Sequence, residues 1–290
     1  MKRRRIKAYQ VFEDSDFPLV CHRHESHNPC PLHSHEFHEL VVVLSGKGTH
    51  ITDNGDYQIE GGDVFVIRGN MRHGYANTEK MALVNIIYDP KRLNLPMTLL
   101  RDLPGYHVLF RIAPKMREYN QFHKPLRLSE EELAETAGMI WRLEQELNRK
   151  NPGYKFAACS WLMNLITFLS RCYSRVPSHA EKPFVKIGDV LSFIEKNYKE
   201  EITIKQLTKI AGMSESTLMR YFRKIMNRSP IDYIIRVRIN KAAELLKSGN
   251  MRVTEAAYEC GFSDGNYFSR QFKKILGRSP REFMKETAFS

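Results

Sequence analysis

A chain of 290 residues, 42% hydrophobic and 27% charged, is long enough for two domains that each bury a core, and this composition excludes a wholly disordered or fibrous protein. The formal charge of +12 indicates attraction to polyanions, which for a soluble protein usually means nucleic acid. Residues 187–290 carry 19 Lys and Arg against 12 Asp and Glu, so this third of the chain is more basic per residue than the rest.

Cysteine usage and hydropathy indicate a cytoplasmic protein. The five cysteines are odd in number and form no Cys-x-x-Cys pair, which is typical of a reducing compartment. The most apolar stretch, residues 156–169, is too short to cross a bilayer, and no apolar signal region follows the basic N-terminus. We therefore expect no membrane segment.

Short β-branched and aromatic runs predict an all-β domain over residues 1–128. The runs cover residues 40–44, 64–67 and 83–88, and the turn clusters 53–56 and 61–63 separate them. Several short strands at this spacing are typical of a small antiparallel sandwich or barrel.

Two helices are predicted over residues 129–173. Ser129 lies three residues before Glu132, as in a capping box, and apolar residues then recur with a helical period as far as Leu147. The Asn-Pro-Gly sequence at 151–153 ends this helix, and a second one follows over about residues 154–173. The hairpin either covers the β-domain or pairs with its copy in a homodimer.

Residues 174–186 are predicted to be a linker, because the stretch 174–183 is polar and contains two prolines. Beyond it, residues 222–234 recur as residues 272–284 with the same Phe, Lys, Ile and Arg-Ser-Pro at matching positions. The chain from 187 to 290 is therefore expected to contain a duplicated helical module.

Each repeat follows the pattern of a helix-turn-helix. In the first, Gly212 forms the turn and Ser214 caps the second helix; in the second, Gly261 and Ser263 take these roles. The inward faces of the second helices are expected to be Leu218, Tyr221, Phe222 and Ile225 in the first copy and Phe268, Phe272 and Ile275 in the second.

The outward faces of these helices are the candidate DNA-binding surfaces. Arg220 and Arg270 suit bidentate contacts to guanine, and Asn266 suits adenine, whereas Lys224 and Lys274 suit phosphates. The full predicted set is Ser216, Thr217, Met219, Arg220, Arg223 and Lys224 in the first copy, and Asn266, Tyr267, Arg270, Lys273 and Lys274 in the second.

One long helix, residues 231–247, is predicted between the two copies. At a rise of ~1.5 Å per residue it spans roughly 25 Å. Such a rod can hold two recognition helices close to one turn of double-stranded DNA, ~34 Å, apart.

Residues 187–290 resemble the DNA-binding domain of the AraC/XylS family of transcription regulators. The resemblance is most specific at residues 261–264, 267–274 and 277–280, with Arg238 and Ala242 in the linking helix. It implies an all-α domain with two helix-turn-helix motifs joined by a long helix, binding to promoter DNA, and activation by contact with RNA polymerase.

The N-terminal half carries a second spacing pattern. His33, His35 and Glu39, followed by Gly46, resemble the first cupin motif, and Gly62, His73 and Asn77 keep the spacing of the second. Arg68 and Asn70 depart from it, because they stand where that motif usually has Pro and Gly. The resemblance implies a jelly-roll fold, and His33, His35, Glu39 and His73 could together ligate a divalent metal.

Three interpretations of these polar residues remain open. A sensor would use His33, His35, Glu39, His73, Tyr75 and Tyr88 to bind a small hydroxylated effector. A cupin metalloenzyme acting on a small carbohydrate, with an attached DNA-binding domain, is the alternative, although no further set of catalytic residues stands out. The third interpretation is a polar cluster whose members satisfy one another.

We favour the sensor, because residues 83–93 are similar to the rhamnose-responsive activators of the AraC/XylS family. The sequence thus predicts a cytoplasmic, dimeric regulator, an activator of carbohydrate genes and not an enzyme. Its all-β cupin domain is expected to bind a sugar-like effector, and its all-α domain to bind promoter DNA.

Overall fold

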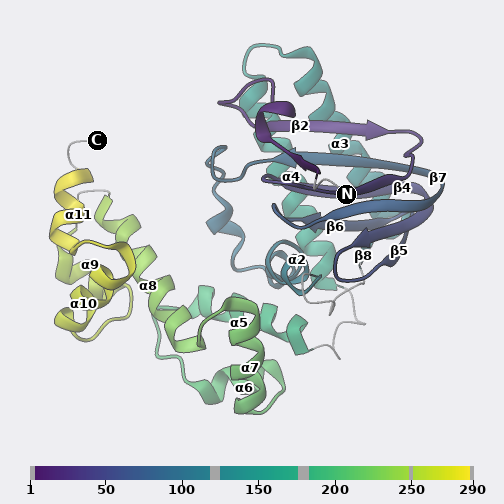
Figure 1. Ribbon diagram of the computed structural model, residues 1–290. Coiled ribbons are helices and arrows are strands. Elements are labelled where there is room, and N and C mark those ends of the chain that lie inside the picture. Colours follow the sequence, from purple (N-terminus) through teal and green to yellow (C-terminus); the bar gives the residue numbers. More distant parts are fainter. Residues whose placement is uncertain (1–3, 118–124, 176–182, 248–250, 288–290) are drawn as a thin grey trace. The chain divides into compact units, whose positions relative to one another are not determined.

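The computed structural model describes residues 4–117, 125–175, 183–247 and 251–287 (Figure 1). Contacts divide the chain into two compact units, residues 1–178 and residues 179–290. The first contains all the described strands and the second is helical, so the expected order of a β domain and an all-α domain is confirmed. Residues 97–117 contain short helical segments, however, so the β domain is not all-β as expected.

The N-terminal unit contains one eight-stranded sheet. Its strands are β1 (Arg4–Ile6), β2 (Leu19–His24), β3 (Cys30–His35), β4 (His38–Thr52), β5 (Tyr57–Glu60), β6 (Asp63–Ile67), β7 (His73–Tyr88) and β8 (Leu126–Arg127). They are hydrogen-bonded in the order β1-β3-β7-β4-β6-β8, with β2 also on β7 and β5 also on β4. All these pairs are antiparallel except β1 with β3.

Strands β4 and β7 are 15 and 16 residues long, so the predicted short strands at 40–44 and 83–88 are only parts of them. Their pairing shifts register three times between Val43 and Thr49. Gly46 has a φ of 72°, and a Cβ there would lie 2.1 Å from the carbonyl oxygen of Lys80. Because such bulges bend and twist a strand without ending it, each chain continues through the bend.

Both faces of strand β4 are covered in its first half. Residues Leu40 to Val43 have no exposed surface, and Val41 and Val43 belong to a core cluster with Phe65 and Leu83. Four short helical segments lie between β7 and β8, namely η2 (Met97–Leu100), α1 (Pro104–His107), η3 (Val108–Ile112) and α2 (Ala113–Arg117). A further short segment, η1 (Ala8–Gln10), follows β1. Of these, η3 and α2 contact β6.

The predicted helical hairpin is present as α3 (Glu130–Arg149) and α4 (Tyr154–Arg175), which pack on each other. The Ser129 hydroxyl accepts the Glu132 backbone N–H, and the Glu132 carboxylate accepts the Ser129 N–H, so the expected capping box is confirmed. Helix α4 also contacts α1, and α3 contacts β2.

The predicted linker is too long at both ends. Helix α4 continues to Arg175, and α5 begins at Pro183, so both helices enter the stretch 174–186. Proline is tolerated in the first turn of a helix, where its missing N–H has no intrahelical partner. Pro183 therefore begins a helix, although its presence had suggested an irregular segment; residues 176–182 lie outside the described part of the chain.

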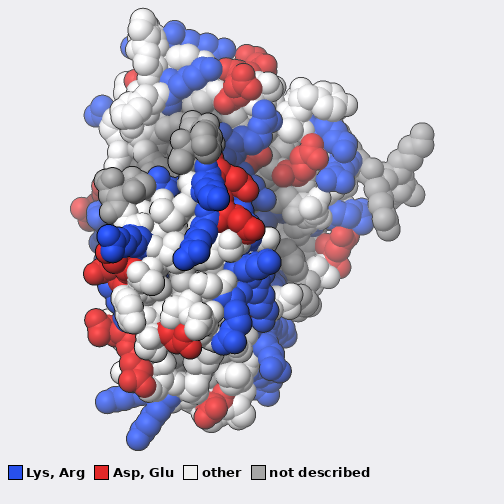
Figure 2. Space-filling view, turned by 90° about the vertical axis from the view of Figure 1, so that its left-hand side faces the viewer, with Lys and Arg blue, Asp and Glu red and all other residues white. Residues whose placement is uncertain are grey.

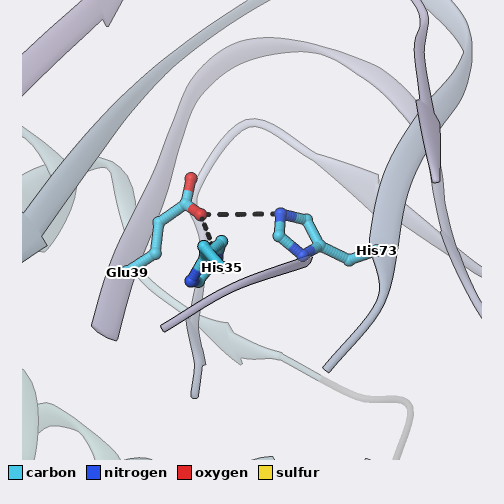
Figure 3. A group of neighbouring side chains, drawn as sticks. All are labelled: His35, Glu39 and His73. Carbon is cyan, nitrogen blue, oxygen red and sulfur yellow. Dashed lines mark hydrogen bonds and ion pairs between the residues drawn. The ribbon is translucent and has the colours of Figure 1, made fainter. Parts of the chain in front are cut away.

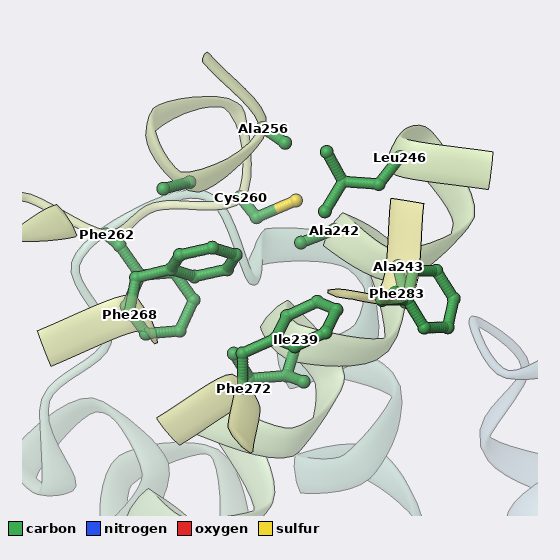
Figure 4. Packing of buried hydrophobic residues seen from close by; sticks show 11 residues of the cluster. Ile239, Ala242, Ala243, Leu246, Ala256, Cys260, Phe262, Phe268, Phe272 and Phe283 are labelled. Atoms are coloured by element: carbon green, nitrogen blue, oxygen red, sulfur yellow. The ribbon is translucent and has the colours of Figure 1, made fainter. Parts of the chain in front are cut away.

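The C-terminal unit consists of α5 (Pro183–Asn197), α6 (Ile204–Ala211), α7 (Glu215–Met226), α8 (Pro230–Lys247), α9 (Val253–Glu259), α10 (Gly265–Leu276) and α11 (Pro280–Thr287). Helix α8 is the predicted rod, and it contacts α9, α10 and α11. Figure 4 shows the core between them, where Phe268, Phe272 and Phe283 pack with Ile239 and Leu246. The helices of the second repeat are thus anchored to α8 through apolar side chains.

None of the described helices is long and apolar enough to span a membrane. All five cysteines are free thiols.

Candidate nucleic-acid interface and effector site

Helices α6 and α7 form the first helix-turn-helix. Gly212, with a φ of 61°, ends α6 in the left-handed conformation that favours glycine. The Ser214 hydroxyl accepts the Thr217 backbone N–H at 3.3 Å, so the predicted cap of α7 is confirmed. The turn is fixed by these two residues.

The two faces of α7 are divided nearly as predicted. Leu218, Phe222 and Ile225 are buried, but Tyr221 is only partly buried. The Arg220 guanidinium lies 5.3 Å from the centre of the Tyr221 ring, a cation–π contact that uses this partly exposed position. Among the predicted DNA contacts of this helix, Ser216, Arg220 and Arg223 are exposed, and Thr217, Met219 and Lys224 are partly exposed.

Helices α9 and α10 form the second helix-turn-helix, and its cap differs from the prediction. The Asp264 carboxylate accepts the backbone N–H groups of Asn266 and Tyr267 at 2.7 and 3.1 Å, whereas Ser263 lies outside the helix. Because this turn is one residue longer than the first, the capping position moves from Ser263 to Asp264. These two hydrogen bonds also hold the pKa of Asp264 below its ordinary value.

The outward face of α10 is open. Asn266, Arg270, Lys273 and Lys274 are exposed, while Tyr267 is partly buried with its ring centre 6.2 Å from that of Phe262. Phe268 and Phe272 are buried, and Ile275 is partly buried against the same cluster. The repeat therefore presents its basic side chains on the side away from the core.

Sequence reasoning missed how the two helix pairs are joined. Arg238 on α8 donates to the carbonyl oxygens of Tyr198 and Glu200 at 2.7 and 2.8 Å, in the segment between α5 and α6. Gly261, with a φ of 83°, lies against that segment, because a Cβ there would be 2.5 Å from the carbonyl oxygen of Lys199. The turn of the second pair is thus in contact with the first half of the unit.

Surface charge alone does not delimit an interface. Figure 2 shows Lys and Arg side chains interspersed with Asp and Glu on the face it presents. The candidate DNA contacts therefore rest on the two outward helix faces and not on a single basic patch.

In the N-terminal unit, three predicted ligands meet. One ligand atom from each of His35, Glu39 and His73 lies within 4.8 Å of the others, and all three side chains are buried (Figure 3). His35 Nε2 lies 3.1 Å and His73 Nε2 3.5 Å from Glu39 Oε2. Burial alone would raise the pKa of Glu39, but the two histidines outweigh burial and lower it, so the carboxylate is ionised.

The hydrogen bonds of His35 favour a cation at this position. Its Nδ1 lies 2.9 Å from the carbonyl oxygen of Phe37, while its Nε2 faces the Glu39 carboxylate. A neutral imidazole carries only one N–H, yet both nitrogens face oxygen acceptors. A proton or a metal ion between Nε2 and Glu39 would satisfy this arrangement, and holding Nδ1 on a backbone carbonyl is the usual orientation of a metal-binding histidine.

His33 and Tyr88 are not in this group. His33 Nδ1 lies 3.1 Å from the carbonyl oxygen of Pro31, and burial lowers the pKa of His33 to about 4. Tyr88 pairs with His38 across β4 and β7, whereas Glu39 pairs with Ile87. Because consecutive strand residues point to opposite faces, Tyr88 lies on the face away from Glu39, so the structure does not place it in one pocket with Glu39.

Tyr75 lies beside the cluster together with two residues that the sequence analysis missed. The Tyr75 hydroxyl, both ring nitrogens of His50 and Asn85 Oδ1 are buried without a hydrogen-bond partner in the described structure. The ring centre of His50 lies 5.2 Å from that of Tyr75 and 5.8 Å from that of His73. Strict alternation along β4 would put His50 on the face of the sheet opposite Glu39. The register shifts between Val43 and Thr49 change this alternation, so that His50 lies on the same face as Glu39.

Comparison with known proteins agrees with this geometry. Residues 207–286 match the family described as "Helix-turn-helix domain", and residues 21–87 match "Cupin domain". The chain is 25% identical over 281 residues to the HTH-type transcriptional activator RhaR of Mannheimia succiniciproducens, covering 96% of this chain and 95% of that protein. It is 28% identical over 255 residues to the activator RhaS of Enterobacter sp., covering 87% and 86%.

A solved structure, a probable AraC family transcriptional regulator from Rhodopseudomonas palustris, is 33% identical and covers 35% of this chain and 96% of its own, with a TM-score of 0.34. A cupin domain followed by a paired helix-turn-helix domain defines a DNA-binding transcription regulator, not an enzyme. The chain is a DNA-binding transcription regulator that is similar over most of its length to the activators RhaR and RhaS.

Proposed function

We propose that this activator switches on carbohydrate genes when a sugar binds inside its β-rich unit. In this proposal residues 1–128 bind the effector, residues 129–173 form a homodimer, and residues 187–290 bind promoter DNA. The names of the relatives support activation, and contact with RNA polymerase is the route by which such an activator would act.

The proposed effector site rests on one observation, the unpaired polar atoms of the Tyr75 and His50 side chains. A buried polar group without a partner costs about 1–3 kcal/mol. Here two side chains less than one-tenth exposed have polar atoms without partners in the described structure, next to the His35, Glu39 and His73 cluster. The hydroxyl groups of a sugar would supply both donors and acceptors to these atoms.

A divalent metal fits the same site. His35, Glu39 and His73 would hold it through two nitrogens and one carboxylate oxygen, a donor set common for first-row metals. When bound, the ion would ligate a sugar hydroxyl oxygen. His33 is partly exposed and bonded locally, so we propose three protein ligands in place of the four expected from the sequence.

The DNA contacts follow from the exposed helix faces. We assign Arg220 and Arg270 to guanine and Asn266 to adenine, because these side chains are exposed near the recognition surface. The remaining contacts that we assign are Ser216, Thr217, Met219, Arg223 and Lys224 on α7, and Tyr267, Lys273 and Lys274 on α10.

The α3–α4 hairpin is our candidate for the dimer interface. Trp141 on α3 is 54% exposed and Phe156 on α4 is 81% exposed, so each helix of the hairpin offers one large apolar side chain that a second copy could cover. A Trp141→Glu and Phe156→Glu double variant should lower the mass measured by light scattering from that of a dimer to that of a monomer.

Titration of the full chain with L-rhamnose, using D-glucose as a control sugar, tests the effector site. We expect L-rhamnose to bind and Tyr75→Phe to weaken it about 2- to 10-fold, the loss of one neutral hydrogen bond. Tyr88→Phe, which removes a hydroxyl on the other face of the sheet, should leave the Kd unchanged. Equal losses in both variants, or none in Tyr75→Phe, would place the sugar elsewhere.

A further inference from the structure

A cavity lies in the N-terminal unit, on the face of β4 opposite the buried cluster of His35, Glu39 and His73. Its volume is about 740 Å³, and Tyr88 and His38 form part of its wall. Because His38 and Glu39 are consecutive residues of β4, this cavity and the buried His/Glu cluster are on opposite faces. Cavities of roughly 300–1,000 Å³ are typical of small-molecule sites.

The charged side chains around this cavity are mostly cationic. Arg68, Lys91, Arg101 and Arg111 line it, against the carboxylates of Glu36 and Asp89. Both carboxylates are already engaged. Glu36 accepts the Ala8 backbone N–H at 3.1 Å and lies 3.5 Å from the Arg5 guanidinium, and Asp89 accepts the backbone N–H groups of Lys91 and Arg92 at 3.0 and 3.3 Å.

Arg68 is the most informative of the four cations. It is partly buried, and its guanidinium has no hydrogen-bond or ion-pair partner among the described residues. It also stands where the second cupin motif usually has proline, so this departure from the motif places a guanidinium at the wall of the cavity. An unpaired, partly buried guanidinium is a strong donor for a carboxylate or a phosphate.

A second arginine, Arg111, is held in position by a hydrogen bond to His107. His107 Nε2 donates to the carbonyl oxygen of Arg101 at 2.6 Å, which leaves Nδ1 as the acceptor for Arg111 at 3.0 Å. Burial lowers the pKa of His107 to about 3, so the ring is neutral and able to accept. Arg111 lies within η3, a π-helical turn of the kind that is frequent at functional sites.

The rest of the wall suits the other parts of a sugar. Phe37, Leu95 and Phe110 offer apolar surface to ring C–H groups. His38 also lines the wall, and a ring nitrogen of His38 can hydrogen-bond a hydroxyl group.

We propose that this cavity binds an anionic sugar, a sugar phosphate or a sugar acid, through Arg68 and Arg111. The site is separate from the effector site proposed above and does not depend on it. Such a ligand would give the regulator a second signal, independent of the neutral sugar.

Calorimetric titration of the full chain tests this proposal. The probes are the 6-phosphates of glucose, mannose and galactose, the three matching uronates, the three neutral hexoses and inorganic phosphate, at low ionic strength because salt screens such contacts. We expect at least one anionic sugar to bind at least ten times more tightly than its neutral hexose and than inorganic phosphate. The Kd values of the phosphates and the uronates then show which anionic group the cavity binds.

Matched variants locate the binding. Arg68→Gln should weaken the anion at least tenfold and Arg68→Lys less, whereas Arg92→Gln, which removes the same charge from an exposed neighbour outside the cavity, should change the Kd less than twofold. Tyr75→Phe should have no effect. The proposal is wrong if no anionic sugar binds, if the neutral hexose or inorganic phosphate binds equally well, or if Arg68→Gln and Arg92→Gln have the same effect.

Discussion

The two units place their polar groups in opposite ways. In the C-terminal unit, Ser192 is the one buried polar or charged residue among those described, and the buried core is otherwise hydrophobic. In the N-terminal unit, buried polar residues include His35, Glu39, His50 and His73. One unit therefore keeps an apolar interior and works through its surface, whereas the other carries its candidate chemistry inside the fold.

This contrast has an energetic meaning. A helical unit with an apolar core can keep its fold while its exposed side chains vary with the DNA sequence that is read. A β-rich unit with buried histidines and a carboxylate gives up some stability, because unpaired polar groups are costly to bury. A ligand that completes these interactions would return that stability, because it binds the folded state and not the unfolded one.

The largest expected effect is on the C-terminal core. Phe272→Ala should lower the free energy of unfolding by about 3–5 kcal/mol, because Phe272 has no exposed surface and truncation leaves a cavity. Chemical denaturation followed by circular dichroism measures this loss. Tyr258→Ala, at a residue 67% exposed, is the control and should cost little. Similar losses in both variants would mean that the core does not hold this unit together.

The second prediction concerns the polar interior. Zn²⁺ at 100 times its Kd should stabilise the N-terminal unit by about 2.7 kcal/mol and leave the C-terminal transition unchanged. His73→Ala should abolish this stabilisation, and His33→Ala should keep most of it, because His33 is outside the ligand group. Calorimetry of the full chain checks both variants. If His33→Ala also abolished the effect, the four-ligand set expected from the sequence would be correct.

The third prediction concerns the surface of the C-terminal unit. Arg270→Ala should cost about 1–3 kcal/mol for DNA carrying the preferred base at one position and relax the preference there, without lowering stability, because Arg270 is exposed. Quantitative binding to a library of single-base variants measures it. A uniform loss across the library would assign Arg270 to a phosphate.

The smallest effect distinguishes the two turns. Ser214→Ala should cost about 1 kcal/mol, because it removes the cap of α7. Ser263→Ala should change stability by less than about 0.5 kcal/mol, because Asp264 caps α10. Thermal unfolding of the two variants compares them, and equal losses would show that Ser263 contributes to the second turn after all.

Local signals predicted the helical part well. The caps of Ser129 and Ser214, the buried faces of α7 and α10 and the rod α8 all follow from interactions within a few residues, which a sequence displays directly. The cap of α10 was misplaced because one inserted residue shifts the turn. Arg238 could not be assigned, since its partners lie about forty residues away in the chain.

The β-rich part was harder to predict, because strand faces depend on register. The cupin spacing found His35, Glu39 and His73, but the bulges of β4 hid His50, and the pairing of Tyr88 with His38 separated it from Glu39. Strand lengths were underestimated for the same reason, since a bend at Gly46 resembles a turn in sequence.

The close approach of Gly261 to the Lys199 backbone has a consequence that binding to DNA can test: it should limit the spacing of the half-sites that this protein binds. Because Arg238 bonds to the same segment, the second helix-turn-helix is tied to the first half of the unit, and we expect the two recognition helices to keep a fixed spacing on DNA. A target in which about five base pairs are inserted between the two half-sites turns one of them to the far side of the duplex. Such a target should be bound by one helix-turn-helix at a time, even where the sequence of each half-site is the preferred one.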